Sequence, residues 1–266
     1  MSKRINFDNF TIVLYQPRYP ENIGSVARAM CNMGFSRLVV IDPPNYDQNK
    51  ILKLATHAAS NVVDNSCICT GLKNTLSNFN YVVGTTARLG GQRQVVNTPS
   101  KLAQKLIPIS IENRIAILFG PEDRGLSNED IRYCHDLVNI PTAEFSSLNL
   151  AQAVMIMCYE IFTAGLEKCT EYTPRLATRH ELDGMYDQLK DILVRISYIN
   201  PENPDYWINK LRRFFSRLQL RAKEVSIIRG ICRQIDWYGK KCYEDGRNMR
   251  QHHETLDHKE FKPKDK

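Results

Sequence analysis

The residues best suited to chemistry fall in three short polar segments, and each of them directly follows an apolar run. The first segment, PENIGSVARAM, places Asn22 two residues before Gly24 and Arg28 one helical turn after it. A helix that begins here would offer free backbone N–H groups to an anion, and Arg28 could face the same anion. Taken alone, the segment also fits an ordinary strand–loop–helix connection with a surface arginine.

The second segment, LFGPEDRGL, holds a carboxylate between two glycines. Gly120 and Gly125 flank Glu122, and a glycine-rich turn after a strand is where open α/β sheets bind their ligands. The carboxylate of Glu122 could hold a ribose, an amine or a neighbouring arginine. A tight turn with an exposed glutamate is the alternative.

The third segment, IPTAEFSSLNLAQA, leads into a long apolar run. Ser146 or Ser147 is the expected N-cap of a helix here. Asn149 would then lie at the start of a helix set for burial, where its amide needs hydrogen-bond partners. A smaller fourth segment, VGTTAR, offers the hydroxyl groups of Thr85 and Thr86 at another strand end.

The elements that must position these segments alternate between apolar runs and amphipathic stretches. Short, nearly continuous apolar runs are typical of strands buried on both faces. They are Thr11–Tyr15, Leu38–Ile41, Tyr81–Val83, Ile115–Phe119 and Leu137–Ile140. The alternation predicts an α/β fold with a mainly parallel sheet and helices on both faces. Because parallel strands end at one edge of a sheet, the four polar segments should gather into one pocket there.

The residue pattern of the chain changes near Thr170, and the chain divides into four parts. We expect an α/β domain at 1–168, a linker at 169–179, an all-helical extension at 180–243 and a charged, disordered tail at 244–266. Basic residues of the extension that could meet RNA phosphates are Lys210, Arg212, Arg213 and Arg217. The nearby Phe214, Phe215 and Leu218 lie at helical spacing and are more typical of a core.

Composition narrows the function classes. The 266-residue chain has a formal net charge of +7, which favours a polyanionic partner such as nucleic acid. No signal peptide or membrane span is expected, and eight cysteines without a secretion signal predict reduced thiols and a cytoplasmic location. Cys67 and Cys69 have no matching pair at zinc spacing, so we expect no metal. The absence of G-x-G-x-x-G argues against a dinucleotide-dependent oxidoreductase.

Taken in order, the segments resemble a known family. N-x-G-x-x-x-R, G-x-E-x-x-G and S-L-N-L resemble the three motifs of the SpoU branch of the SPOUT methyltransferases. VGTTAR, SSLNLAQA and the extension resemble the TrmJ type, whose members methylate the 2′-oxygen of cytidine or uridine in tRNA. The resemblance runs from Thr11 to about Ile235. One departure is Phe145, where relatives commonly have a tyrosine.

This resemblance implies a specific enzyme. It implies a C-terminal deep trefoil knot in the sheet, S-adenosylmethionine bound in the knot, and a homodimer acting on tRNA at position 32 of the anticodon loop. Arg28 would be the catalytic arginine, with Asn22 and Glu122 shaping the site and Arg88 near the RNA. The cofactor contacts implied are Thr85, Thr86, Ala87, Gly120, Ile140, Ser147, Leu148 and Asn149.

Two points stay open at this level. A guanidinium is protonated at neutral pH, so we favour Arg28 as a cation that fixes a phosphate and stabilises developing charge, rather than as a simple base. The substrate could also be rRNA or another tRNA position. A protein that keeps the knotted fold and binds RNA without catalysis is the alternative from a different class.

Overall fold

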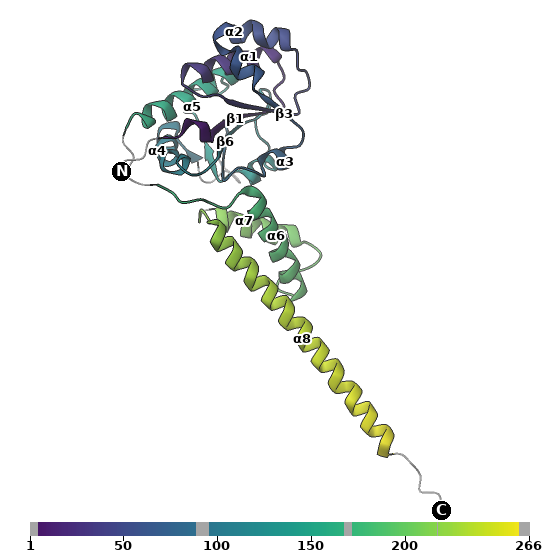
Figure 1. The fold of residues 1–266 in the computed structure, drawn as a ribbon. Helices are drawn as coiled ribbons and strands as arrows, with labels where there is room; N and C mark the ends of the chain where they lie inside the picture. The colour runs from purple at the N-terminus through teal and green to yellow at the C-terminus, as the bar shows by residue number, and fades with distance from the viewer. Residues whose placement is uncertain (1–4, 89–95, 168–171, 217, 261–266) are drawn as a thin grey trace, which may run out of the picture. The chain divides into compact units, whose positions relative to one another are not determined.

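The structure, a computed structural model, describes residues 5–88, 96–167, 172–216 and 218–260 (Figure 1). The described residues form a seven-stranded sheet in the order β3-β2-β1-β6-β4-β7-β5, and every neighbouring pair is parallel. The strands are β1 (Phe10–Tyr15), β2 (Arg37–Ile41), β3 (Cys67–Cys69), β4 (Tyr81–Thr85), β5 (Val96–Asn97), β6 (Ile115–Phe119) and β7 (Asp136–Val138). The predicted parallel α/β architecture is confirmed.

All five strands expected from the sequence are present. Ile115–Phe119 forms β6 with the predicted bounds, whereas β7 ends at Val138, two residues before the expected Ile140. Ile140 therefore belongs to the loop after the strand. The short strands β3 and β5 were not predicted, because runs of two or three residues carry no readable periodicity.

Helices cover both faces of the sheet. Within β1, Ile12 and Leu14 belong to one core cluster, and Val13 between them belongs to the other. Figure 1 shows α1, α2 and α5 on one face and α3 on the other. Burial on both faces explains why the strands read as continuous apolar runs. The helices of this part are α1 (Pro20–Asn32), α2 (Gln48–Asp64), α3 (Leu72–Leu76), α4 (Pro99–Ser110) and α5 (Leu150–Gly165), with 3-10 helices η1 (Phe7–Asn9) and η2 (Asp130–Tyr133).

Gly24 serves helix packing. A Cβ atom built on Gly24 would lie 2.1 Å from the carbonyl oxygen of Ile51 in α2. The absence of a side chain at Gly24 therefore lets the backbones of α1 and α2 approach each other closely. Any larger residue would push these two helices apart.

The segment predicted as a linker, 169–179, is tied down over the part that the structure describes. The backbone N–H of Leu176 donates to Asn113 Oδ1 at 2.7 Å, and Asn80 Nδ2 donates to the Leu176 carbonyl at 2.8 Å. Both asparagines are buried. The polar composition of this segment indicated a linker, but composition cannot show that buried amides elsewhere bind its backbone.

The helical extension contains α6 (Arg179–Arg195), α7 (Pro204–Ser216) and α8 (Ala222–Glu260). α8 continues to Glu260, through most of the segment 244–266 for which a disordered tail was expected. Nucleation is the costly step of helix formation, and once α8 has started, each added residue gains a hydrogen bond until a breaker intervenes. Pro263 is the next proline in the sequence.

The chain divides into two compact units at other points than predicted. One unit comprises Met1–Leu182 and Phe214–Ala222, and the other comprises Asp183–Arg213 and Lys223–Lys266. The division falls within α6 rather than in a linker before it. None of the helices in the described part of the chain is long and apolar enough to cross a membrane.

Candidate active site

The three polar segments meet through one chain of hydrogen bonds. Asn22 Nδ2 donates to Glu122 Oε1 at 2.7 Å, and Asn149 Nδ2 donates to Asn22 Oδ1 at 3.3 Å. The amide of Asn22 thus links the other two, which lie 100 and 127 residues away in the sequence. The predicted convergence of the three segments at one sheet edge is confirmed.

Asn149 is the N-cap of α5, where a serine was expected. Its Oδ1 accepts a hydrogen bond from the backbone N–H of Ala151 at 2.9 Å. Ser146 and Ser147 precede the cap and are exposed. One asparagine therefore caps the helix with its oxygen and reaches Asn22 with its nitrogen, a division of roles that a serine hydroxyl could not fill as well.

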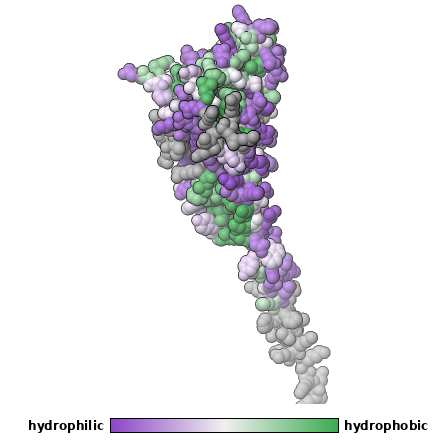
Figure 2. All heavy atoms as spheres, turned by 60° about the vertical axis from the view of Figure 1, so that its left-hand side comes forward, coloured by the Kyte–Doolittle hydropathy of each residue, from purple (hydrophilic) through white to green (hydrophobic). Residues whose placement is uncertain are grey.

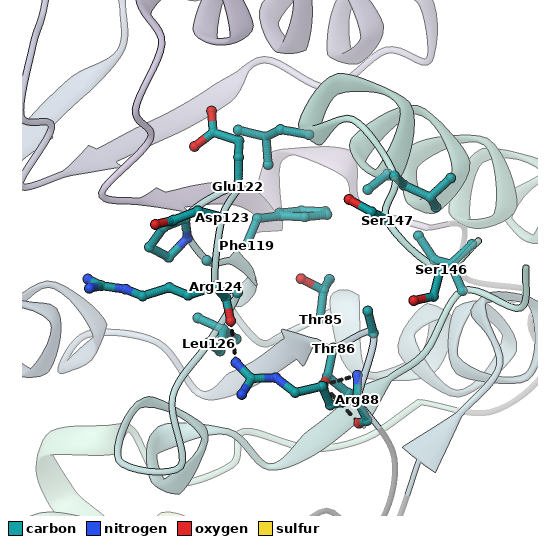
Figure 3. A pocket seen from close by; sticks show the side chains of 18 of the residues that line it. Thr85, Thr86, Arg88, Phe119, Glu122, Asp123, Arg124, Leu126, Ser146 and Ser147 are labelled. Carbon is teal, nitrogen blue, oxygen red and sulfur yellow. Dashed lines mark hydrogen bonds between the residues drawn. The ribbon is translucent and has the colours of Figure 1, made fainter. Parts of the chain in front are cut away.

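A cavity of about 280 Å³ opens beside this chain of hydrogen bonds (Figure 3). Loops after β4, β6 and β7 line it, together with the start of α5. Of the eight residues predicted to contact a cofactor, all but Asn149 lie in its wall: Thr85, Thr86, Ala87, Gly120, Ile140, Ser147 and Leu148. Asn149 does not line the cavity and instead caps α5.

Glycines shape the floor of the cavity. A Cβ atom on Gly120 would lie 2.5 Å from the backbone of Gly125 and Leu126, so the loop after β6 can fold back only over a glycine. Gly125 has a φ of +62°, a conformation that L side chains rarely adopt. The G-x-E-x-x-G spacing is thus explained by the turn itself, with Glu122 at its outer end.

The loop after β4 is held by its neighbours. The backbone N–H of Thr86 donates to the Val138 carbonyl at 2.9 Å, and Asn139 Nδ2 donates to the Thr86 carbonyl at 2.8 Å. Thr85 Oγ1 donates to the Leu118 carbonyl at 3.1 Å. These bonds present the backbone of this loop to the cavity. Sequence reasoning missed Asn139, because it placed this residue inside the predicted strand Leu137–Ile140, whereas β7 ends at Val138.

The rim of the cavity carries three exposed arginines. The Arg18 guanidinium pairs with Asp123 at 2.9 Å, and the Arg18 backbone N–H donates to Glu122 Oε2 at 2.9 Å. The Arg88 guanidinium donates to the Arg124 carbonyl, and the Arg124 guanidinium donates to Gln16 Oε1. We call Arg18, Arg88 and Arg124 the arginine rim. Of these, only Arg88 was predicted.

Charges of both signs act on Tyr15, which lies near Arg124. Burial, followed by the carboxylates of Asp130 and Asp42, raises the pKa of Tyr15, and Arg124 works in the opposite direction. Asp130 and Ser127 bond each other reciprocally: the backbone N–H of Ser127 donates to Asp130 Oδ2 at 2.7 Å, and the backbone N–H of Asp130 donates to Ser127 Oγ at 3.1 Å. These two bonds close the turn that leads into the short 3-10 helix η2.

Arg28 does not line this cavity. It is an exposed residue of α1 and lines a second, largely apolar groove of about 530 Å³ formed with α5. Leu148 lines both the groove and the cavity. Within one chain, Arg28 therefore lines a neighbouring groove and not the cavity that the predicted cofactor contacts form. Helical spacing placed it near the site but could not show on which side of α5 it lies.

The predicted basic residues of the extension differ in what they contact. Arg212 donates to the buried Asp183 at 2.8 Å and lies over the Tyr186 ring, whereas Lys210 lies over the exposed rings of Tyr206 and Trp207. The Arg213 side chain is exposed, and Arg217 lies outside the described residues. Arg212 is thus engaged within the extension by a buried carboxylate and a ring, whereas Lys210 lies over exposed rings.

Two of the large apolar residues near this basic segment are exposed. Phe214 is 56% exposed and Leu218 is 51% exposed, against the expectation from their helical spacing. Such spacing places residues on one face but cannot show whether another element covers that face. Figure 2 shows hydrophobic residues at the surface among hydrophilic ones in this part of the chain.

Two family comparisons match the chain. Residues 9–159 match the SpoU rRNA Methylase family, and residues 180–253 match the C-terminal domain of tRNA methyltransferase TrmJ. Together these matches take in the cavity, the second groove and the helical extension.

Individual relatives agree. A tRNA (cytidine/uridine-2′-O-)-methyltransferase TrmJ of Pectobacterium atrosepticum is 34% identical over 234 residues, which are 86% of this chain and 97% of the relative. A Pseudomonas aeruginosa TrmJ, named for cytidine, uridine and adenosine, is 32% identical and covers 84% of this chain and 92% of its own. The crystal structure of TrmJ from Z. mobilis ZM4 superposes with a TM-score of 0.73 at 28% identity, over 85% of this chain and 98% of that one.

Proposed function

From the premise that the chain belongs to the SpoU methylase family, as a member of its TrmJ type, we propose that it is an S-adenosylmethionine-dependent tRNA 2′-O-ribose methyltransferase. The observation that carries the proposal is the bonded set Glu122–Asn22–Asn149 beside the glycine-floored cavity. We further propose cytidine or uridine 32 of the anticodon loop as the target. The knotted C-terminal segment of the fold and a cytoplasmic location belong to the same proposal.

The cavity fits the cofactor in its donor set. Backbone groups and the hydroxyls of Thr85, Thr86 and Ser147 can bond a ribose and an adenine, and Leu126 and Ile140 supply apolar wall. At the floor, Gly120 lets the loop after β6 fold back closely on itself, because a Cβ atom there would meet the Gly125 backbone. When bound there, S-adenosylmethionine supplies a methyl group already activated by its sulfonium. The protein must therefore chiefly position the methyl group and the ribose hydroxyl, and exclude water.

Glu122 serves as a positioning residue. Both of its carboxylate oxygens already accept hydrogen bonds, Oε1 from Asn22 and Oε2 from the backbone of Arg18. A carboxylate occupied in this way is poorly placed to take the proton of a ribose hydroxyl. It orients the amide of Asn22, which in turn holds Asn149.

Arg28 would act on the ribose as a cation. Its guanidinium can fix a phosphate of the target nucleotide and stabilise negative charge as it develops on the 2′-oxygen. The proton then leaves late, to water or phosphate. Arg28→Lys keeps the charge but loses the planar fork, so it should be badly impaired. If the methylation rate, measured where chemistry is limiting, does not rise from pH 7 toward pH 9, a deprotonation step loses its support.

A homodimer is part of the proposal, because Arg28 and the cavity lie on different sides of α5 within one chain. A second copy seated on the groove between α1 and α5 would cover apolar side chains such as Met155 and Ile156 and could bring the partner's cavity to Arg28. Co-purified subunits carrying Arg28→Ala and Gly120→Ala separately should regain methylation that neither homodimer shows. Light scattering of the parent chain at a monomer mass would contradict the dimer.

The proposal is tested with the purified chain, labelled S-adenosylmethionine and RNA transcripts. We expect label on tRNA and not on rRNA. Mapping of the product should place the 2′-O-methyl group on the ribose of nucleotide 32. Label on rRNA alone would overturn the tRNA assignment. Binding of RNA without any binding of S-adenosylmethionine by calorimetry would instead support a non-catalytic RNA-binding protein.

A further inference from the structure

Arg124 differs from its neighbours on the arginine rim in how its charge is partnered. The Arg18 guanidinium faces a carboxylate, that of Asp123, at 2.9 Å. The Arg124 guanidinium instead donates to a neutral amide, that of Gln16, and the side chain is exposed. A neutral acceptor orients a guanidinium without cancelling its charge, and leaves most of its five N–H donors available.

Gln16 holds this bond from an unusual backbone conformation. It follows β1 with a φ of +51°, in the left-handed region that non-glycine residues rarely occupy. Its backbone N–H is fixed by the Ile41 carbonyl at 2.8 Å. Strain of this kind persists where the surrounding structure imposes it, and it concentrates at functional sites. Here it aims a side chain at an arginine on the rim of the cavity.

Arg124 and Arg88 are joined at the same place. The Arg88 guanidinium donates to the Arg124 backbone carbonyl, so two guanidinium-bearing residues from the loops after β4 and β6 lie together at the mouth of the cavity (Figure 3). Arginine is suited to phosphate because its planar fork forms paired, charge-assisted hydrogen bonds.

We propose that Arg124, oriented by Gln16, binds a backbone phosphate of the RNA next to the nucleotide whose ribose enters the cavity. This inference rests on the proposed function, because it assigns a substrate contact to that same site. Gln16 is a positioning residue: it touches Arg124 and not the RNA. Arg18, whose charge is balanced by Asp123, is assigned no such contact.

The test compares Arg124→Ala with the parent chain in binding to a tRNA transcript at several salt concentrations. We expect about tenfold weaker binding, as for one charge-assisted hydrogen-bonded contact, and a salt slope shallower by about 0.7, as for one single-stranded phosphate. S-adenosylmethionine affinity should be unchanged, and Arg124→Lys should recover part of the loss. The alanine keeps the backbone carbonyl that Arg88 uses.

Arg37→Ala is the matched control, because Arg37 is an exposed arginine at the start of β2, on the opposite edge of the same parallel sheet. Its binding and salt slope should equal those of the parent. Gln16→Gly relieves the backbone strain and removes the amide, so it should weaken tRNA binding in the parent and add nothing in Arg124→Ala.

Two outcomes would overturn the inference: tRNA binding by Arg124→Ala equal to that of the parent, or a parallel loss of S-adenosylmethionine affinity, which would show a structural role. A parent chain that neither binds nor methylates tRNA would instead defeat the proposed function, so the two failures are distinguishable.

Discussion

The sheet edge and the helical extension hold their polar residues in different ways. At the sheet edge, side chains from loops far apart in sequence bond one another, as Asn22 does with Glu122 and Asn149. In the extension, contacts are mostly between a cation and a ring or one carboxylate, as for Lys210 over Trp207, and large apolar side chains such as Tyr238 and Ile231 remain exposed. The first arrangement fixes loop side chains against one another beside a cavity, whereas the second leaves cations and large apolar side chains exposed.

The strongest test of a preformed sheet edge is Gly120→Ala. The new methyl group would meet backbone atoms at 2.5 Å, so the loop after β6 must move. A displacement near 1 Å at a reacting site can lower the rate about a hundredfold. We expect loss of S-adenosylmethionine binding by calorimetry. Gly125→Ala, where nothing lies within 4 Å and only the positive φ is strained, should do less. Equal behaviour of the two variants would contradict a floor set by close approach.

Arg212→Ala tests whether the extension also contains a structural pair. The substitution removes the Arg212 guanidinium from the buried Asp183 carboxylate, and breaking a buried ion pair typically costs about 3 kcal/mol. We expect a lower urea midpoint, with any loss of tRNA binding following from unfolding. Lys210→Ala removes only a partly exposed cation–ring contact and should cost about 0.5–1 kcal/mol. An unchanged midpoint for Arg212→Ala, with weaker tRNA binding, would make Arg212 an RNA contact instead.

Glu181→Gln probes the junction between the two regions. Burial works to raise the pKa of Glu181, but the Thr178 backbone N–H and the Arg175 guanidinium outweigh it, so the pKa lies below its ordinary value of 4.5. A lowered pKa means that this carboxylate stabilises the fold above pH 4.5 and that the contribution is lost as the pH falls. We expect Glu181→Gln to be about 1 kcal/mol less stable at pH 7, as for loss of a helix cap.

The difference in urea midpoint between this variant and the parent should narrow when both are measured below pH 4. A difference that stays constant with pH would show that the ionised cap of α6 is not its source.

Gly239→Ala should have the smallest effect, and in the opposite direction. A Cβ atom on Gly239 of α8 would meet nothing within 4 Å, and alanine favours a helix over glycine by about 0.5–1 kcal/mol. We expect slightly higher helix content by circular dichroism and unchanged S-adenosylmethionine binding. A clear loss of tRNA binding would show that this part of α8 approaches the RNA closely.

Much of the fold followed from pattern. Strands buried on both faces read as apolar runs, and glycines read as turns, so the parallel sheet and the gathering of polar loops at one edge were predictable. The helical tail of α8 was not, because charged composition resembles disorder unless one knows that a packed helix precedes it. The hydrogen bonds that hold the segment around Leu176 could not be predicted either, since their partners Asn80 and Asn113 lie far away in the sequence.

The sequence by itself determined which residues form the site, through the order and spacing of Asn22, Gly120, Glu122 and Asn149. Only the tertiary structure decided what each does: that Asn149 caps α5, that both oxygens of Glu122 are occupied, and that Arg28 lies on the far side of Leu148 from the cavity. It also revealed Gln16 and Arg124 as partners. Spacing along a chain specifies neighbours on one element, whereas hydrogen bonds between loops depend on how separate elements pack.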